Sequence, residues 1–363
     1  MPKTWKLKFE LNIKPENFVA ILNSIDNLIR TLASMPIPPS ALAKMERLNI
    51  IRAIRGTTGI EGNRLTEEEV AKIYDSPSAE APIDVQEREN YNASQVMRYV
   101  RDYEASPPLR LTEKMIKQIH VLTTEDIKNP LNEPGKYRRD YVYAGIYEFP
   151  DPKDVPALMK SFVTFINSPE VMTLHPIVRA VVAHFYFVTV HPFGDGNGRV
   201  ARAIEAFLLF HSGYNAAGFY SLANYYYRNR REYIKQLDSV RFEYDGDLTE
   251  FTRFALNGFL LELTDIYNQA IPYMRVIKYS QTIDALIAEG DLSQRLGVAL
   301  KEIADMSEGL TSQEFIGRIP DWVRKLYRGR SERTLRYDLT LMKQSGLIEK
   351  VDGRIRARIG IIQ

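Results

Sequence analysis

The sequence predicts a predominantly α-helical protein with one small β-hairpin, followed by a helical C-terminal domain that ends in a second hairpin. Three observations lead to this fold class. Apolar residues recur at helical spacing through roughly the first 270 residues. Residues 133–152 interrupt that pattern with a Tyr- and Val-rich stretch bounded by Gly and Pro. From about residue 275, helical patterns lead into two strand-like runs around Asp352-Gly353, a tight hairpin signal.

Bulk composition narrows the function classes. The chain has 363 residues, enough for two or three domains, and a net charge of +2. Binding to nucleic acid or to an anionic membrane would therefore depend on local charge. The chain has no cysteine, which excludes disulfides and thiolate zinc sites. The N-terminus lacks a signal-like apolar core, and the longest apolar run, residues 177–190, is too short for a bilayer. We expect a cytoplasmic protein without membrane contact.

The elements of the first 270 residues follow from periodicity and capping signals. Thr66 and Glu69 form a capping box that opens a helix, and residues 76–84 read as a loop. Residues 133–152 are expected to form a hairpin or extended flap. The remaining expected helices are 15–54 with a break at 35–40, 85–104, 112–124, 154–167, 176–190, 198–211, 230–241 and 247–268.

The C-terminal elements describe a winged helix-turn-helix. Helices are expected over residues 295–306, 310–319 and 331–346, with Thr311 and Ser331 as caps of the second and third. Two strands within residues 347–362 would form the wing. Three helices followed by a two-stranded wing make up this fold.

One short stretch, HPFGDGNGRVAR over residues 191–202, combines groups suited to phosphate chemistry. Pro192 ends the preceding helix, and three glycines allow backbone N–H groups to open onto the next helix N-terminus, an anion-binding arrangement. Arg199 and Arg202 share a helix face in a first turn where the helix dipole disfavours cations, a penalty that a bound anion reverses.

The same stretch supplies a metal ligand and a base. Asp195 offers a hard oxygen ligand suited to Mg²⁺, and His191 offers a group that titrates near neutral pH. No Walker-type phosphate loop is present in the sequence. The combination therefore points to phosphoryl or nucleotidyl transfer by a different architecture.

HPFGDGNGRVAR resembles the signature of the Fic family, His-Pro-Phe-x-x-Gly-Asn-Gly-Arg-x-x-Arg, at every fixed position. The resemblance covers roughly residues 110–255 and implies transfer of AMP from ATP, with Mg²⁺, to a Ser, Thr or Tyr hydroxyl of a target protein or of the chain itself. Together with the C-terminal elements described above, it leads us to expect three domains: 1–109 as an N-terminal helical region, 110–270 as the Fic core, and 275–363 as the winged helix-turn-helix. It also implies that His191 is the base and that Asp195 holds Mg²⁺. The implied phosphate ligands are Gly194, Gly196, Asn197, Gly198, Arg199 and Arg202, the last at the γ-phosphate.

The resemblance extends to substrate recognition. The flap at 133–152 would hold target backbone as an added strand. The Tyr-rich segment after the motif resembles the family's adenine side, so we expect Tyr225, Tyr226 and Tyr233 to line or border the base, although an aromatic core stripe would show the same spacing. Relatives often carry an Asn shortly after this helix, and residues 238–247 contain none.

A glutamate lies where a helix dipole disfavours it. Glu61 follows Thr57 by one turn and precedes Gly62, a good helix terminator, so it needs a cationic partner. A surface lysine would satisfy it. The Thr57-x-x-x-Glu61-Gly62 pattern also resembles the inhibitory motif of Fic proteins, which implies that Glu61 pairs with Arg202 and takes the place of the γ-phosphate. Relatives with this motif often self-associate, so a homodimer is one expected assembly.

The C-terminal domain is a candidate DNA-binding module. Arg333, Arg336 and Lys343 would face DNA while Leu335 and Leu339 face the core. Two alternatives stay open beside AMP transfer: a DNA-binding regulator whose Fic domain senses nucleotide, and a Fic enzyme that transfers another phosphate-containing group. The remaining histidines show no zinc-site spacing and are expected to be structural: His120, His175, His184 and His211.

Overall fold

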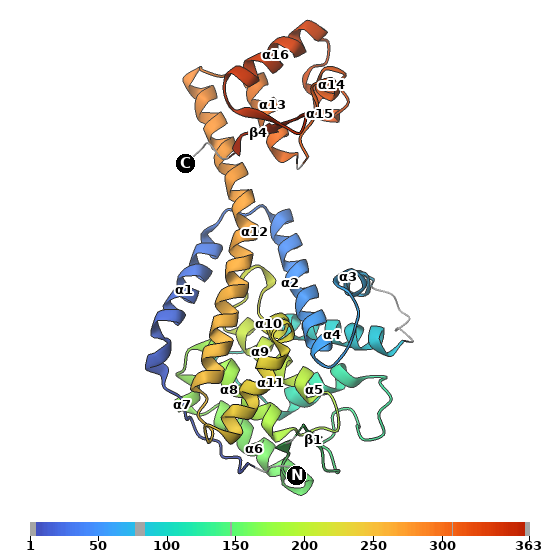
Figure 1. Cartoon of the computed structure of the whole chain (residues 1–363), viewed down its shortest axis with the longest axis vertical. Helices are drawn as coiled ribbons and strands as arrows, with labels where there is room; N and C mark the ends of the chain where they lie inside the picture. Colours follow the sequence, from blue (N-terminus) through green and yellow to red (C-terminus); the bar gives the residue numbers. More distant parts are fainter. Residues whose placement is uncertain (1–4, 77–83, 146, 307, 360–363) are drawn as a thin grey trace. The chain divides into compact units, whose positions relative to one another are not determined.

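The computed structural model describes residues 5–76, 84–145, 147–306 and 308–359. It divides into two compact units, one of Met1–Ser34 and Pro39–Tyr267 and the other of Met35–Pro38 and Asn268–Gln363. Both are built mainly of helices, which confirms the expected fold class (Figure 1). The sheets of the described residues are two antiparallel pairs, β1–β2 and β3–β4.

The first unit contains the elements up to α11 and the start of α12. The N-terminal ones are η1 (Pro15–Phe18), α1 (Val19–Ser34), α2 (Pro39–Ile60), α3 (Glu67–Asp75), α4 (Val85–Asp102) and α5 (Glu113–Thr124). The hairpin and central helices are β1 (Tyr143–Ala144), β2 (Tyr147–Glu148), η2 (Pro152–Asp154), α6 (Val155–Ile166), α7 (Pro169–Met172), α8 (Pro176–Val190) and α9 (Asn197–His211). The last are η3 (Ala216–Gly218), α10 (Ala223–Arg228), α11 (Arg230–Phe242) and α12 (Thr249–Glu289).

The core of this unit is the pair α8 and α9, which pack against each other. Every residue of α8 from Ile177 to Val190 is buried, as expected for a helix that is apolar on all sides. Helices α4 and α5 pack on α9, and α2 packs on α4 and α10. This packing brings the C-terminal end of α2 to the first turn of α9.

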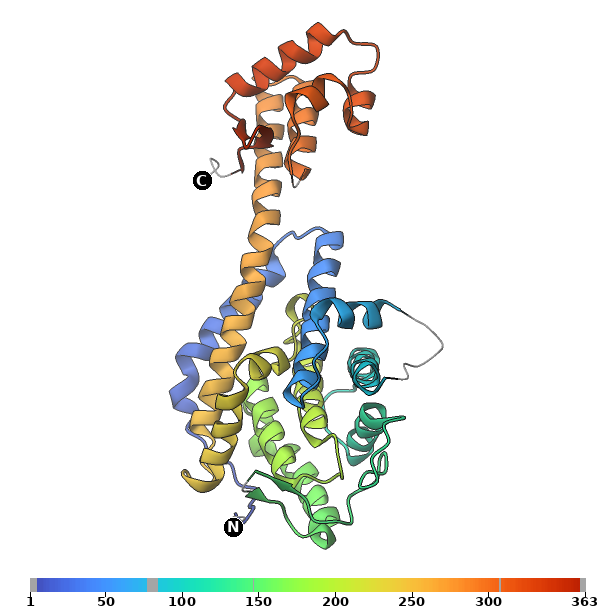
Figure 2. The same cartoon turned by 45° about the vertical axis from the view of Figure 1, so that its right-hand side comes forward.

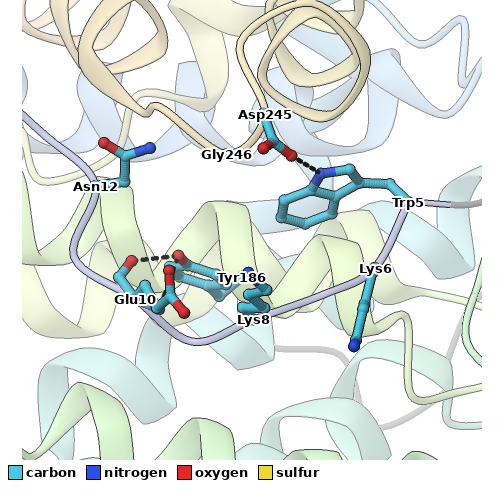
Figure 3. Close-up of a pocket in the computed structure, with 8 residues that line it drawn as sticks. All are labelled: Trp5, Lys6, Lys8, Glu10, Asn12, Tyr186, Asp245 and Gly246. Atoms are coloured by element: carbon cyan, nitrogen blue, oxygen red, sulfur yellow. Dashed lines mark hydrogen bonds between the residues drawn. The ribbon is translucent and has the colours of Figure 1, made fainter.

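The start of the chain forms an extended segment across α8. Side chains alternate between partly buried and exposed from Trp5 to Asn12, the period of an extended strand. Trp5 Nε1 donates to Asp245 at 3.3 Å, and the Tyr186 hydroxyl donates to the Glu10 carbonyl (Figure 3). These contacts border a hollow of about 380 Å³.

The predicted flap is mostly irregular. Its strands span only two residues each, with Tyr143 opposite Glu148 and Ala144 opposite Tyr147. The buried side chain of Arg138 explains why: it donates to the carbonyls of Asp140 and Pro150, so side-chain bonds hold this stretch in place of a long strand ladder. Residue 146 lies outside the described part of the chain.

The predicted helix end at residue 268 is wrong. Helix α12 continues for 41 residues to Glu289 and includes Pro272. A proline removes one helical hydrogen bond and costs about 3 kcal/mol in a helix interior. The later turns of α12 offset this cost because Tyr279 and Ile283 are buried in the core of the second unit. The boundary between units therefore falls within a helix.

The second unit contains the predicted C-terminal helices and hairpin (orange to red in Figure 2). Thr311 forms a capping box with Glu314, and Ser331 caps α16. Asp352 and Gly353 both have positive φ, as a tight two-residue turn requires. One short helix, α15, was not predicted as a separate element. The elements are α13 (Gln294–Asp305), α14 (Ser312–Ile316), α15 (Asp321–Leu326), α16 (Glu332–Gln344), β3 (Ile348–Val351) and β4 (Arg354–Ala357).

Two further expectations concern the N-terminal half. The capping box of Thr66 and Glu69 is confirmed, with both reciprocal hydrogen bonds present. The loop predicted at 76–84 lies outside the described residues from 77 to 83, as do residues 360–362 of the predicted second strand. Within the described part of the chain, no helix has the length and apolar character needed to cross a membrane.

Candidate active site

The loop between α8 and α9 places His191 at the mouth of a cleft. His191 is the C-terminal cap of α8, with φ of 51° in the left-handed region. Its ring stacks on Phe149 with centroids 3.8 Å apart, and Nδ1 donates to the Val188 carbonyl at 3.2 Å. That bond leaves Nε2 as the nitrogen able to accept a proton. Burial lowers the pKa of His191 to about 4, so the ring is neutral at neutral pH.

The glycines fit this loop for steric reasons. Gly196 has φ of 76° as the N-cap of α9. A Cβ on Gly194 would lie 1.8 Å from the carbonyl oxygen of Leu131, which leaves no space for a side chain. The first main-chain bond of α9 runs from Val200 N to the Gly196 carbonyl, so the N–H groups of residues 197–199 have no helical acceptor. These groups form the anion-binding end of the helix.

Side-chain hydrogen bonds hold the loop rigid. Asn197 is buried, and its amide both accepts from Phe193 N and donates to the Phe193 carbonyl, at 2.9 and 2.8 Å. The side chain of Asn197 is therefore engaged by the Phe193 backbone, and it is the backbone N–H of Asn197 that faces no helical acceptor. The His120 ring stacks on Phe193 at 3.6 Å and contacts the Asp195 carbonyl through Nε2, so this histidine positions the loop.

Arg202 is buried and paired with the end of α2. Its Nη2 donates to Glu61 Oε1 at 2.6 Å and to the Thr57 carbonyl at 2.9 Å, while Nε donates to the Thr57 hydroxyl at 2.9 Å. Burial raises the pKa of Glu61, but the Arg202 charge outweighs it and the net pKa is lowered. Glu61 is thus ionised at neutral pH, and the ion pair is lost only as the pH falls through this lowered pKa. Gly62 follows with φ of 104°, as a helix terminator requires.

Arg199 is held away from the cleft. Its guanidinium pairs with Glu89 of α4 at 3.2 Å and with Asp195 at 3.3 Å. Glu89 also accepts from the Asn63 side chain at 2.8 Å, so the segment after Glu61 and the first turn of α9 share one carboxylate. Arg199 Nε is buried without a hydrogen-bond partner among the described atoms.

The cleft has a volume of about 510 Å³. Most predicted site residues contribute to it, and exposed apolar side chains of the flap form part of its wall. The lining residues are Ile60, Glu61, Leu131, Tyr141, Val142, Tyr143, Ala144, Val188, His191, Gly194, Asp195, Gly196, Asn197, Gly198, Arg202, Arg230, Tyr233, Ile234 and Leu237.

Of the three predicted tyrosines, only Tyr233 is among these lining residues. The Tyr226 ring is completely buried, and Tyr225 packs against Phe254 with centroids 5.0 Å apart. The expectation that Tyr225 and Tyr226 border a bound base is therefore not supported by their position. Aromatic spacing on a helix does not distinguish a core stripe from a ligand wall, and here two of the three rings belong to the core.

Two residues of this region were not predicted from the sequence. Arg138 donates to the His191 carbonyl at 2.8 Å and so connects the flap to the loop between α8 and α9. Glu89 pairs with Arg199 across 110 positions of sequence. No local sequence signal marks either contact, because each depends on elements that meet only in the folded chain.

The chain is similar to known proteins in sequence and in fold. Residues 110–209 match the Fic/DOC family model. The chain is 28% identical over 234 residues to a protein adenylyltransferase Fic of Drosophila erecta, which covers 64% of this chain and 45% of that protein. It is 29% identical over 231 residues to the same-named protein of Aedes aegypti. The chain spans less than half the length of these curated relatives.

Solved structures show the same fold. A Fic family protein from Desulfovibrio desulfuricans G20 has a TM-score of 0.59 and 20% identity, and the match covers 94% of this chain and 95% of that one. Fic-1 from C. elegans has a TM-score of 0.57 and 24% identity, covering 68% of this chain and 71% of that one. Residues 110–209 therefore resemble the Fic/DOC family in sequence, and the chain shares the fold of solved Fic proteins.

Proposed function

We propose that this protein transfers AMP from ATP to a Ser, Thr or Tyr hydroxyl of a target protein or of itself, with attack of the hydroxyl oxygen on the α-phosphate and release of pyrophosphate. The observation that carries the proposal is the convergence, in one cleft, of a neutral His191, the open N–H groups of α9 and the buried Arg202. The relatives named protein adenylyltransferase support the same reaction.

Each group in the cleft has a separate role in the proposed reaction. His191 accepts the proton of the attacking hydroxyl at Nε2, since Nδ1 is already bonded to Val188. The backbone N–H groups of Asn197 and Gly198 hold phosphate oxygens at the N-terminus of α9. Arg202 binds the γ-phosphate, and Arg199 binds the β/γ-phosphates once it leaves Glu89.

Asp195 fits a Mg²⁺ ion held mainly by phosphate. Within the described residues, no group of three or more His, Asp or Glu side chains gathers as a protein cage. Mg²⁺ commonly uses one or two carboxylates and takes its other ligands from phosphates and water. Asp195 lines the cleft, and although burial raises its pKa, Arg199 makes the net pKa lower than usual, so the carboxyl group is ionised. Bound Mg²⁺ would supply charge neutralisation at the α- and β-phosphates.

Glu61 acts in this proposal as an inhibitor. Its carboxylate occupies Arg202, the group that would bind the γ-phosphate. A Cβ built on Gly198 would lie 2.4 Å from Glu61 Oε1, so Glu61 also lies against the phosphate loop. ATP can then bind only in a pose that leaves the γ-phosphate without Arg202.

Intact mass spectrometry after incubation with ATP and Mg²⁺ tests both parts. We expect Glu61→Gly to gain one AMP per chain and the wild type to gain at least about tenfold less, since Arg202 becomes free. His191→Ala in the same background is the control and gains none. A mass increase equal to phosphate or UMP would contradict AMP transfer, and equal labelling of Glu61→Gly and wild type would contradict the inhibitory role.

A second candidate, DNA binding by the C-terminal unit, is favoured by one observation. Arg333, Arg336 and Lys343 are exposed on α16, while Leu335 and Leu339 on its other face are buried. Such a helix presents a basic face suited to phosphate contacts. In this alternative the Fic domain binds nucleotide as a sensor, and the second unit binds DNA in response.

A further inference from the structure

A network of buried polar side chains extends from Arg202 into the core, and the proposed reaction does not explain it. It consists of Tyr233 on α11, His184 on α8, and Glu205 and Arg202 on α9. Each of these side chains is at most 3% exposed. Burying a carboxylate and a guanidinium is costly unless every group is hydrogen-bonded, so their placement needs a reason.

The hydrogen bonds of this network have one consistent direction, from donor to acceptor. The charge of Arg202 acts on the nearby Tyr233 hydroxyl, and since a guanidinium can only donate, the Tyr233 oxygen is the group that would accept from it. The Tyr233 hydroxyl is then free to donate to His184 Nε2 at 2.8 Å. His184 in turn donates from Nδ1 to Glu205 Oε2 at 2.9 Å.

The end of this network that is farther from the cleft is anchored to the core. Glu205 Oε2 also accepts from the Tyr226 hydroxyl at 3.0 Å, and Oε1 accepts from Leu222 N at 3.4 Å. The Tyr226 and Tyr233 rings stack with centroids 4.6 Å apart. The anchor therefore fixes the Tyr233 hydroxyl from two sides, through His184 and through its stacked neighbour.

The other end of this network lies at the cleft. Tyr233 and Arg202 both line it, and Arg202 is held on its other side by Thr57 and Glu61. If Glu61 is displaced by a movement of α2, the contacts of Arg202 with Thr57 change as well, because Thr57 lies on the same helix. Tyr233 is instead held by His184 of α8, which bonds Glu205 of α9.

We infer that Tyr233 is a positioning residue, held by His184 and Glu205, that orients Arg202 toward the γ-phosphate when Glu61 is displaced. This rests on the proposed function, since it deepens the role given there to Arg202. It also assigns Tyr233 a different task from the adenine contact expected from the sequence. The two tasks differ in which nucleotides they affect, because only the γ-phosphate distinguishes ATP from ADP.

The test compares the affinities of α,β-methylene ATP and α,β-methylene ADP, which cannot be cleaved between the α- and β-phosphates. Calorimetry is done with Mg²⁺ in the Glu61→Gly background, where Arg202 is free of Glu61. We expect Tyr233→Phe to weaken binding of the ATP analogue about tenfold and to leave the ADP analogue within about twofold, because the oxygen that would accept from the freed Arg202 guanidinium is lost.

Tyr226→Phe is the matched control. It removes a buried hydroxyl from the same network and the same stacked pair, but that hydroxyl bonds Glu205 and not Arg202. Thermal unfolding should show a similar loss for both variants, while the ATP-to-ADP affinity ratio changes only for Tyr233→Phe. Glu205→Gln, whose bond to His184 leads through Tyr233 toward Arg202, should lower that ratio by about twofold to threefold.

Equal weakening of both analogues by Tyr233→Phe would overturn the inference and favour an adenine contact. An unchanged ratio in both Tyr233→Phe and Glu205→Gln would assign the network to stability alone. These outcomes do not depend on transfer: if Glu61→Gly gains no AMP, the proposed reaction fails while the affinity ratio still reports on Arg202.

Discussion

At the residue scale, the environment of His191 decides when it can act as a base. Burial is the main cause of its lowered pKa, and the charges of Arg138 and Arg241 lower it further. The Val188 carbonyl opposes this by accepting from Nδ1. The result is an imidazole that is already unprotonated at neutral pH, with its free nitrogen available to a substrate hydroxyl.

The pH dependence of transfer should follow from this pKa of about 4. A base must be unprotonated, so kcat/KM should rise as the pH increases through about 4 and stay flat above about pH 6 on this limb. Glu61→Gly is the suitable protein, because it removes the titration of the Glu61–Arg202 pair. A kcat/KM that rises about tenfold per pH unit above pH 6 would assign the base to another group.

Removal of the imidazole gives a second test at this scale. In the Glu61→Gly background, His191→Ala should lower the rate of AMP transfer by about a hundredfold or more, as expected for loss of a general base. The affinity for ATP should stay within about twofold, since no phosphate ligand changes. Transfer at an undiminished rate in a folded His191→Ala variant would exclude this residue as the base.

At the element scale, the packing of α2 determines the position of Glu61. This helix is held against α10 without intervening side chains at Gly56: a Cβ there would lie 2.6 Å from the backbone of Ala223 and Asn224. Near its end, Asn90 of α4 donates to Asn63 and accepts from Thr58. The position of Glu61 therefore depends on close helix packing and on a polar contact with α4.

Gly56→Ala should separate α2 from α10. Because the added methyl meets backbone, we expect a destabilisation of about 1–3 kcal/mol, even though Ala favours a helix over Gly by about 1 kcal/mol. The shift also displaces Glu61, so self-labelling of the otherwise wild-type protein should increase. Ser40→Ala, at the exposed start of the same helix, is the control and should change stability by less than about 0.5 kcal/mol. A stabilised Gly56→Ala variant would contradict the packing argument.

At the scale of the whole molecule, the chain comprises two units with separate cores. The first contains the cleft, and the second presents the exposed basic face of α16. Within that second unit, Arg354 does not contribute to such a face, because it donates to the Glu308 and Gly309 carbonyls and pairs with Glu314. The homodimer expected from the family resemblance stays a prediction.

The two units should be separable by mutation. If α16 contacts DNA, the double variant Arg333→Ala/Lys343→Ala should weaken duplex binding and reduce the slope of log affinity against log salt by about 1.8, as two phosphate contacts are lost. Transfer of AMP in the Glu61→Gly background should be unchanged. Fluorescence anisotropy with a labelled duplex at several salt concentrations measures this. No salt-dependent binding by the wild-type chain would exclude DNA as the partner of α16.

Sequence and structure agree best where the signals are local. Capping by Thr66, Thr311 and Ser331 and the Asp352-Gly353 turn were predicted because each involves contacts within a few residues. Helix α12 differs from its predicted end because burial in the second unit outweighs the local cost of Pro272. The hairpin expected within residues 133–152 from their Tyr- and Val-rich composition is present but short, and the Arg138 side chain adds bonds to the Asp140 and Pro150 carbonyls.

By itself, the sequence determined the helical class and the chemistry of the loop at residues 191–202, because backbone sterics and helix ends depend on near neighbours. Only the tertiary structure showed that Arg199 meets Glu89, across 110 positions, whereas the pairing of Arg202 with Glu61, across 141, was expected from the family resemblance and not from residue spacing. It also decided that Tyr226 belongs to the core while Tyr233 reaches the cleft. Such pairings depend on how helices pack, and residue spacing along one helix does not encode its neighbours.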